Sequence, residues 1–106
     1  MPVWQTARVE AEPEIILVRW RVLQTDCGDR HLVGARRDDF NGRVSSAIVE
    51  LDVSRSVVVT RSGRIYQLEG APGYNADAQY VWDNWCVVNG VTSYEDVTSS
   101  VYPNAS

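Results

Sequence analysis

The sequence predicts an α+β domain: a strongly bent antiparallel sheet of about five strands, either open or closed into a small barrel, with one C-terminal helix packed on it. Short runs of alternating apolar and polar residues, separated by turn residues, extend from residue 15 to residue 70. After Gly73 the apolar residues take up helical spacing instead. With 106 residues, 44% of them hydrophobic and 23% charged, the chain has enough apolar surface for one core and too little for two.

We therefore expect one domain, divided into an N-terminal extension (1–14), a sheet (15–70), a helix (75–90) and a C-terminal segment and tail (91–106). The N-terminus has no basic region followed by an apolar stretch, and the longest apolar run, Ile15 to Val18, is too short to cross a bilayer. These features predict a protein of the bacterial cytoplasm without a membrane partner.

Cysteine and arginine usage carry further information. Cys27 and Cys86 are expected to be free thiols, because nothing at the N-terminus points to an oxidising compartment. The sequence contains ten arginines and no lysine. This bias is typical of a GC-rich genome and indicates a bacterial or phage origin.

The first predicted strand covers Ile15 to Leu23. Its even-numbered positions from 16 to 22 are all apolar, so this face should meet the core, while Arg19 and Arg21 project from the other face. A second strand over His31–Arg36 follows a turn at Asp26–Asp29 and can pair with the first as a hairpin.

Two further reversals follow. The Asn41-Gly42 step predicts a tight turn, and Val44–Val53 then reads as one half-buried strand whose odd-numbered positions 49 to 53 face the core. Ser62-Gly63 separates Val57–Thr60 from Arg64–Leu68, which predicts a second hairpin.

A helix is predicted from about Ala76 to Asn89. Asn75 suits the N-cap, Asp77 places a negative charge in the first turn, and Gly90 suits the C-terminal cap. The apolar stripe that should cover the sheet consists of Ala78, Val81, Trp82, Trp85 and Val88, with Cys86 as a small buried neighbour. Downstream, Thr92–Glu95 fits a capping box and predicts one further helical turn.

Signatures of enzyme chemistry are weak in this chain. Cys27, Asp29 and His31 nominally provide a nucleophile, an acid and a base, but in a turn that leads into a strand their side chains need not converge. The sequence has one histidine, two cysteines and no CxxC or HExxH motif, so we expect no metal site. Phosphate-binding and GxSxG motifs are also missing from the sequence. We predict no catalytic residues and no cofactor.

Charge is distributed unevenly along the chain. Residues 1–15 have a net charge of −2, residues 16–64 of +3 and residues 65–106 of −5, and the last block has no basic residue. A purely acidic surface of this kind would attract a host protein with a basic groove, such as a nucleic-acid channel. The acidic residues we expect to bind a partner are Asp77, Asp83, Glu95 and Asp96.

Arginines supply an alternative binding face. Several should cluster on the sheet, and an interleaved aromatic residue would suit a surface that binds nucleic acid. The residues in question are Arg19, Arg21, Arg36, Arg37, Arg43, Arg61, Arg64 and Tyr66. Two observations oppose this: the sequence pI is about 4.8, and the arginines can instead pair with carboxylates such as Asp38 and Asp39. Trp4, in the acidic N-terminal segment, either covers a sheet edge or contacts a partner.

Four segments of the chain read CGDRHLVG, GRVSSAIVELD, TRSGRIYQLEG and YVWDNWCVVNGVTSYEDVT. Across them the chain resembles small proteins of proteobacterial phages and integrated mobile elements, a set without an assigned activity. Small acidic proteins of such elements often block host machinery, so the resemblance implies a non-enzymatic, stoichiometric inhibitor of a host defence protein, such as a CRISPR effector. A nucleic-acid-binding sheet domain and a small enzyme are the alternatives.

Overall fold

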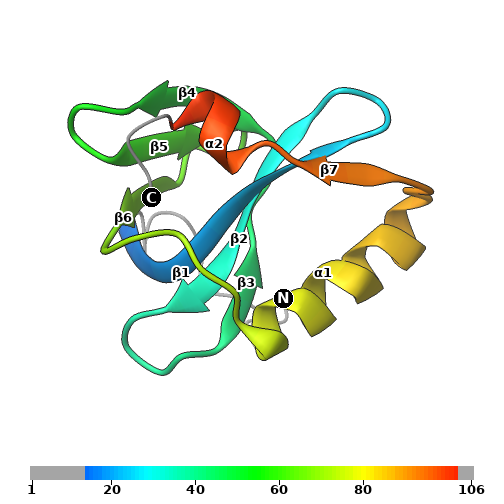
Figure 1. The fold of residues 1–106 in the computed structure, drawn as a ribbon, viewed down its shortest axis with the longest axis horizontal. Helices are drawn as coiled ribbons and strands as arrows, with labels where there is room; N and C mark the ends of the chain where they lie inside the picture. The colour runs from blue at the N-terminus through cyan, green and yellow to red at the C-terminus, as the bar shows by residue number, and fades with distance from the viewer. Residues whose placement is uncertain (1–13, 103–106) are drawn as a thin grey trace, which may run out of the picture.

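The computed structural model describes residues 14–102 and has an α+β fold, as predicted (Figure 1). It contains a seven-stranded sheet and two helices. In chain order the elements are β1 (Glu14–Thr25), β2 (Arg30–Arg36), β3 (Gly42–Val44), β4 (Ile48–Asp52), β5 (Val57–Thr60), β6 (Ile65–Leu68), α1 (Ala76–Asn89), β7 (Tyr94–Asp96) and α2 (Thr98–Val101). The predicted Trp4 contact lies outside the described residues.

The long strand β1 organises the sheet. The strand order is β3-β2-β1-β6-β5-β4, and β7 pairs with the C-terminal part of β1. Both predicted hairpins, β1–β2 and β5–β6, are confirmed as antiparallel pairs. The prediction of an antiparallel sheet with about five strands is wrong in two respects, because there are seven strands and because β6 runs parallel to β1. That pairing joins residues about fifty positions apart, which no local pattern encodes.

The sheet is strongly curled but open. Its outer strands β3 and β4 follow one another in the sequence, so residues 45–47 must carry the chain from one end of the sheet to the other. On the way, the Ser45 N–H donates to the Leu32 carbonyl at 2.9 Å and the Arg61 N–H donates to the Ala47 carbonyl at 2.8 Å. Over residues 14–102, β3 and β4 form no ladder with each other. The alternative of a closed barrel is therefore wrong.

A bulge in β1 overturns part of the predicted alternation. Arg19 has a φ of 49°, and the register with β2 shifts between Val18 and Arg21. The inserted residue exchanges the faces of the strand. Ile15 and Leu17 therefore share a core with Trp20 and Val22, while Ile16 and Val18, predicted to face that core, are only half-buried.

The predicted strand Val44–Val53 is in fact two strands at opposite ends of the sheet. Ser45 and Ala47 are buried in the link between β3 and β4. A second register shift, between Ile48 and Glu50, turns Val49 outward to 67% exposure, although the alternation placed it inward. A one-residue shift in a strand moves each side chain to the other face, which explains the error.

The chain reverses near Asn41-Gly42 as predicted, but with different backbone conformations. Phe40 takes the left-handed conformation with a φ of 60°, and Gly42 is the first residue of β3. A Cβ atom on Gly42 would lie 2.5 Å from the Ala78 backbone nitrogen. Glycine is needed here because β3 and the first turn of α1 touch through their backbones.

Helix α1 begins and ends at the predicted residues. The Ala78 N–H donates to Asn75 Oδ1 at 2.8 Å, and Gly90 has a φ of 69° and donates to the last turn. Ala78, Trp82 and Cys86 are buried as predicted, and Trp85 is half-buried. Val88 is 82% exposed, so its assignment to the buried stripe is wrong. The helix packs on β2 and β3.

The predicted helical turn at Thr92–Glu95 is also wrong, because Tyr94–Asp96 forms β7, antiparallel to Leu23–Thr25 of β1. The helical turn comes later, as α2. Asp96 Oδ1 accepts hydrogen bonds from the Thr98 N–H at 2.9 Å and from the Thr98 hydroxyl at 2.6 Å, and so satisfies the first backbone N–H of α2. Free backbone groups along β1 stabilise the segment more than an isolated turn would.

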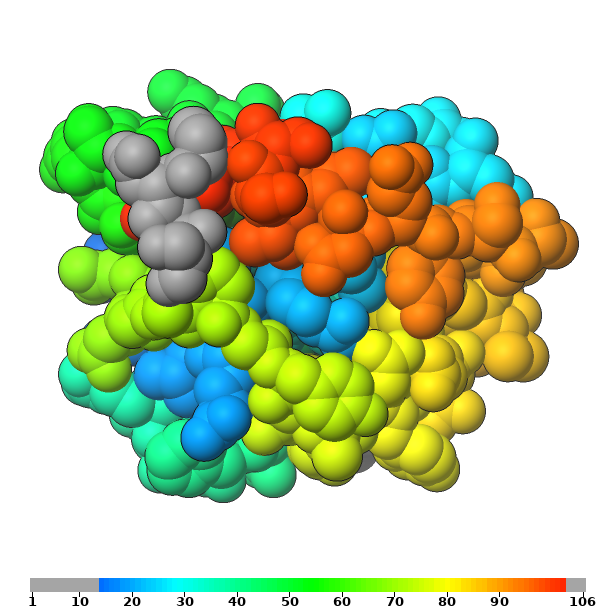
Figure 2. Space-filling model, viewed as in Figure 1, coloured from blue at the N-terminus to red at the C-terminus, as the bar shows by residue number. Residues whose placement is uncertain are grey.

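Both faces of β1 and β2 contact core residues. Trp20, Val22 and Leu32 belong to a cluster with β5, β6 and Val97, whereas Leu23 and Val33 pack under α1 with Trp82. In Figure 2, β1 in blue is visible between the orange and red C-terminal segment and the yellow-green loop before α1. Within residues 14–102, no helix combines the length and apolar character needed to cross a membrane.

Candidate functional site

A cavity of about 360 Å³ opens beside the C-terminal half of α1. Its polar wall contains Cys27 and Asp29 from the β1–β2 turn, His31 from the start of β2, and Arg61 from the β5–β6 turn. Trp85 of α1 contributes an apolar wall. With Ser46 and Ala47 from the link between β3 and β4, the site combines residues from four separate parts of the chain, held together by the curl of the sheet and the packing of α1.

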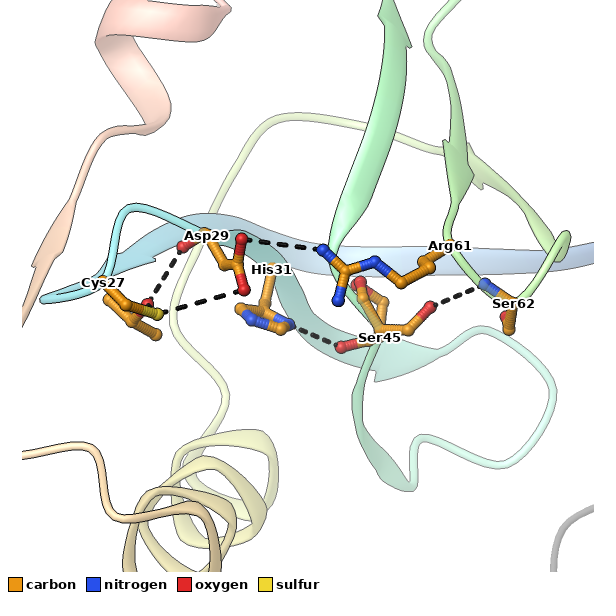
Figure 3. Close-up of polar contacts among 8 residues, drawn as sticks. Cys27, Asp29, His31, Ser45, Arg61 and Ser62 are labelled. Carbon is orange, nitrogen blue, oxygen red and sulfur yellow. Dashed lines mark hydrogen bonds and ion pairs between the residues drawn. The ribbon is translucent and has the colours of Figure 1, made fainter.

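His31 is held rigidly at the base of the cavity. Its side chain is 5% exposed, and its Nδ1 lies 2.9 Å from the Ser45 carbonyl oxygen. Because a carbonyl oxygen only accepts, Nδ1 carries the proton, and Nε2 of the neutral ring is left as an acceptor. The ring also lies 4.6 Å from the Trp85 ring, measured between centroids. In Figure 3 the second ring nitrogen lies on the side of Cys27, away from Ser45.

Cys27 lies at the mouth of the cavity and is exposed. Its Sγ is 3.0 Å from Thr25 Oγ1 and 3.9 Å from Asp29 Oδ2 (Figure 3). The other carboxylate oxygen of Asp29 lies 3.7 Å from an Arg61 guanidinium nitrogen. A thiol, a carboxylate and a guanidinium thus follow one another along the rim. The other cysteine, Cys86, is buried, and this burial raises the pKa of its thiol. The negative charges of Asp83 and Asp26 raise the pKa further.

The structure brings the nominal trio of Cys27, Asp29 and His31 to one cavity, although the turn-strand geometry gave no reason to expect this. The trio is not arranged as a catalytic triad, because Ser45, and not Asp29, orients the imidazole. No group of three or more His, Cys, Asp or Glu side chains within the described part of the chain is suited to hold a metal ion. Ser45 had no sequence signal, and Arg61 and Trp85 were predicted only for the arginine face and the apolar stripe, because each joins this site through long-range folding.

The four predicted acidic residues occupy two kinds of position. Asp77 Oδ2 accepts the Gly42 N–H at 2.5 Å and joins α1 to β3, and Asp96 accepts the first backbone N–H of α2. Asp83 accepts a hydrogen bond from Gln79 at 2.8 Å on the exposed side of α1, and Glu95 is exposed on β7. Asp83 and Glu95 are therefore available to a partner without a structural role in the fold, whereas Asp77 and Asp96 also hold elements together.

Most of the predicted arginine face is occupied by contacts within the molecule. Arg37 pairs with Glu69 at 2.8 Å, and Arg61 with Asp29. Arg36 lies within 4.0 Å of Asp38 and 3.8 Å of Asp39, as the carboxylate-pairing alternative predicted. Arg64 is buried and makes contacts of its own.

Three further arginines and Tyr66 complete the predicted set. Arg21 donates to Gln79 at 2.6 Å and lies over the Tyr74 ring, while Arg19 is exposed beside Gly73. Arg43 donates to the Tyr66 hydroxyl at 3.0 Å. Tyr66 is 2% exposed, so its ring is in the core and is not on a surface where a base would stack.

The outer face of α1 was not recognised in the sequence. Tyr80, Val87 and Val88 are 66%, 81% and 82% exposed. Tyr80 and Val87 are about two helical turns apart and lie opposite Trp82, and Val88 lies next to them on the same exposed side. The signal was present in the sequence, since Val87 lies opposite the predicted apolar stripe. Asp83 and Asn84 lie among these residues on the same exposed side.

No protein-family model matches the chain, and no curated protein or solved structure is significantly similar to it. The class of the protein is therefore described by its own fold and site: it is an α+β domain with a polar cavity and an exposed helix face. The resemblance to proteins of mobile elements stays a prediction.

Proposed function

We propose that the protein is a non-enzymatic binding protein that acts by stoichiometric association with a host protein through the outer face of α1. The observation that carries this proposal is the exposure of Tyr80, Val87 and Val88 on one side of a well-capped helix. Large apolar side chains that gather on an exposed helix face are typical of surfaces that fit a groove on a partner.

Charge defines what kind of partner fits. Asp83 lies on α1 and Glu95 on β7, and residues 65–106 have no basic side chain. A complementary partner therefore has an apolar groove with a basic rim, as in a protein that binds nucleic acid. Together with the resemblance to mobile-element proteins, this favours a host defence protein such as a CRISPR effector, blocked at its nucleic-acid channel.

The arginine face supports direct nucleic-acid binding less well. Phosphate contacts depend on positive charge that is free to replace counterions. Arg36, Arg37 and Arg61 are already paired with carboxylates. The exposed face of α1 supports protein binding better, because these arginines form no comparable basic groove free of carboxylate partners.

The proposal is tested by crosslinking and then by affinity measurement. A photoreactive benzoylphenylalanine placed at position 88 should crosslink to one host protein in bacterial cells, whereas the same group at exposed Arg55, in the turn between β4 and β5, should not. With that partner purified, calorimetry should give one bound chain per site, and Val87→Glu with Val88→Glu should weaken binding at least about 100-fold.

Controls separate binding from folding. Asn84→Ser, on the same helix face, should retain both affinity and thermal stability, and Asp83→Lys with Glu95→Lys should slow association most strongly at low salt. Equal crosslinking from positions 88 and 55 would contradict the proposal. So would nucleic-acid binding by the purified chain that is steeply salt-dependent and lost in Arg19→Glu/Arg21→Glu, which would establish the alternative.

A further inference from the structure

From the cavity beside α1 we infer a second site: Cys27 is a thiol that forms a mixed disulfide with a low-molecular-weight disulfide bearing carboxylates, such as glutathione disulfide. The inference is independent of the proposed binding face, because the cavity and Val87/Val88 use different side chains. It rests on the convergence of the Cys27 thiol, the buried His31 imidazole and the Arg61 guanidinium on one cavity.

His31 gives the strongest reason to regard this cavity as a site. His31 is 5% exposed, and its Nδ1–H donates to the Ser45 carbonyl oxygen. Over residues 14–102, Nε2 has no hydrogen-bond partner, yet the side chain lines the cavity (Figure 3). Nε2 itself is open to the cavity, so it is positioned to accept a hydrogen bond or a proton from a group at the cavity.

Arg61 indicates the charge of the ligand. Its side chain is 68% exposed, and its ion pair with Asp29 is long, at 3.7 Å, and open to solvent. Exposed pairs of this kind contribute little stability, so the guanidinium can exchange Asp29 for a carboxylate of the ligand. Trp85 provides an apolar wall for the remainder of the ligand.

The chemical step is a thiol–disulfide exchange. The Cys27 thiol transfers its proton to His31 Nε2, and the thiolate sulfur attacks one sulfur of the ligand. A new S–S bond forms as the ligand S–S bond breaks, and the departing thiolate takes the proton from His31. Cys27 is oxidised and the departing thiol is reduced, so no other oxidant is needed. His31 and Cys27 share no hydrogen bond before the ligand enters, and such contacts commonly shorten in a loaded site.

The experiment compares an anionic and a cationic disulfide on the full chain. Wild-type protein is treated separately with glutathione disulfide and with cystamine, and mixed disulfides are followed by intact mass and located by digestion. We expect one adduct per folded chain, at Cys27, with Cys86 unmodified. Arg61→Gln should lower the rate with glutathione disulfide by about fivefold relative to the rate with cystamine.

The matched control for Arg61 is Arg55→Gln, which removes an arginine from another turn and should leave the ratio of the two rates unchanged. His31→Asn should slow both reagents at least about tenfold. If that variant proves unfolded by circular dichroism, the Arg61 ratio still decides the charge preference. Cys27→Ser should abolish modification and leave partner binding intact, which separates this inference from the proposed function.

Three outcomes would overturn the inference. One is modification of Cys86 in preference to Cys27 in the folded chain. Another is a Cys27 rate no higher in the folded chain than in the urea-unfolded chain. The third is a rate ratio that Arg61→Gln and Arg55→Gln change equally.

Discussion

The two sides of β1 and β2 differ in how they are filled. On one side, Trp20 lies in a cluster of nine buried residues from β1, β2, β5, β6 and Val97. On the other side, five buried residues, including Trp82, pack under α1. The larger cluster is closed by strands and α2, whereas the α1 side leaves a polar cavity and an exposed helix face.

This difference suggests a division of roles. Stability depends mainly on the Trp20 side, where burial is continuous, and the features that could contact other molecules lie on the α1 side. Loosely filled regions are where binding sites are commonly found. The following substitutions test that division, beginning with the largest expected effect.

Trp20→Ala should destabilise most strongly. The Trp20 side chain is 1% exposed and contacts the Tyr102 ring edge-on at 5.0 Å between centroids. Removing it leaves a large cavity at the centre of the larger cluster, and we expect a loss of about 5 kcal/mol in the free energy of unfolding. Urea denaturation measures this loss. Val49→Ala, at an exposed position of β4, should change stability by less than about 0.5 kcal/mol.

Trp82 and Trp85 are a matched pair on the α1 side. Their rings stack at 5.1 Å, but only Trp82 is fully buried. Trp82→Ala should cost about 3–5 kcal/mol, and Trp85→Ala about 1–2 kcal/mol, because part of the Trp85 ring already faces the cavity. Thermal melts of both variants provide the comparison. An equal loss would show that the α1 side is closed as tightly as the Trp20 side.

Gly42→Ala tests the backbone contact between β3 and α1. The added Cβ would meet the Ala78 nitrogen at 2.5 Å, so the helix must shift, at a cost of about 1–3 kcal/mol. Gly73→Ala is the control, since its Cβ would find its nearest neighbour, the Arg19 Cα, at 3.6 Å. If denaturation midpoints of the two variants agree, the close approach does not constrain α1.

Asn75→Ala removes the N-cap of α1. The Asn75 side chain accepts the Ala78 N–H, and loss of such a cap costs about 1 kcal/mol. Hydrogen exchange should rise in the first turn of α1 and remain unchanged in β5 and β6. Asn84→Ala, at an exposed position in the middle of the helix, serves as the reference. If hydrogen exchange became faster across the whole sheet to the same extent, the two sides would unfold as one unit.

The smallest expected effect is a pH dependence. Burial raises the pKa of the Cys86 thiol in the folded chain, so its contribution to stability is complete below the ordinary pKa of a thiol. That contribution is lost as the pH rises through the alkaline range, because the unfolded chain ionises first. Denaturation at neutral and alkaline pH should show a smaller decline for Cys86→Ala than for wild type.

Local signals were sufficient for α1 and for both hairpins. Asn75 and Gly90 act within one helical turn of the groups they stabilise, so they could be identified from the sequence. The charge of the C-terminal block could be identified in the same way. The hydrogen bond of Asp77 to Gly42 in β3 could not be identified in this way. The exposure of Val87 could be identified from its place opposite the predicted apolar stripe, whereas that of Val88, which was assigned to the stripe, required knowing which side of the helix the sheet would cover.

The tertiary structure decided the rest. The bulge at Arg19, the parallel pairing of β1 with β6 and the strand at Tyr94–Asp96 all depend on hydrogen bonds to distant segments. The cavity likewise needs His31, Arg61 and Trp85 to meet after the sheet has curled. Short-range propensity acts between residues a few positions apart, whereas strand pairing and side-chain convergence are determined by the burial of the whole chain.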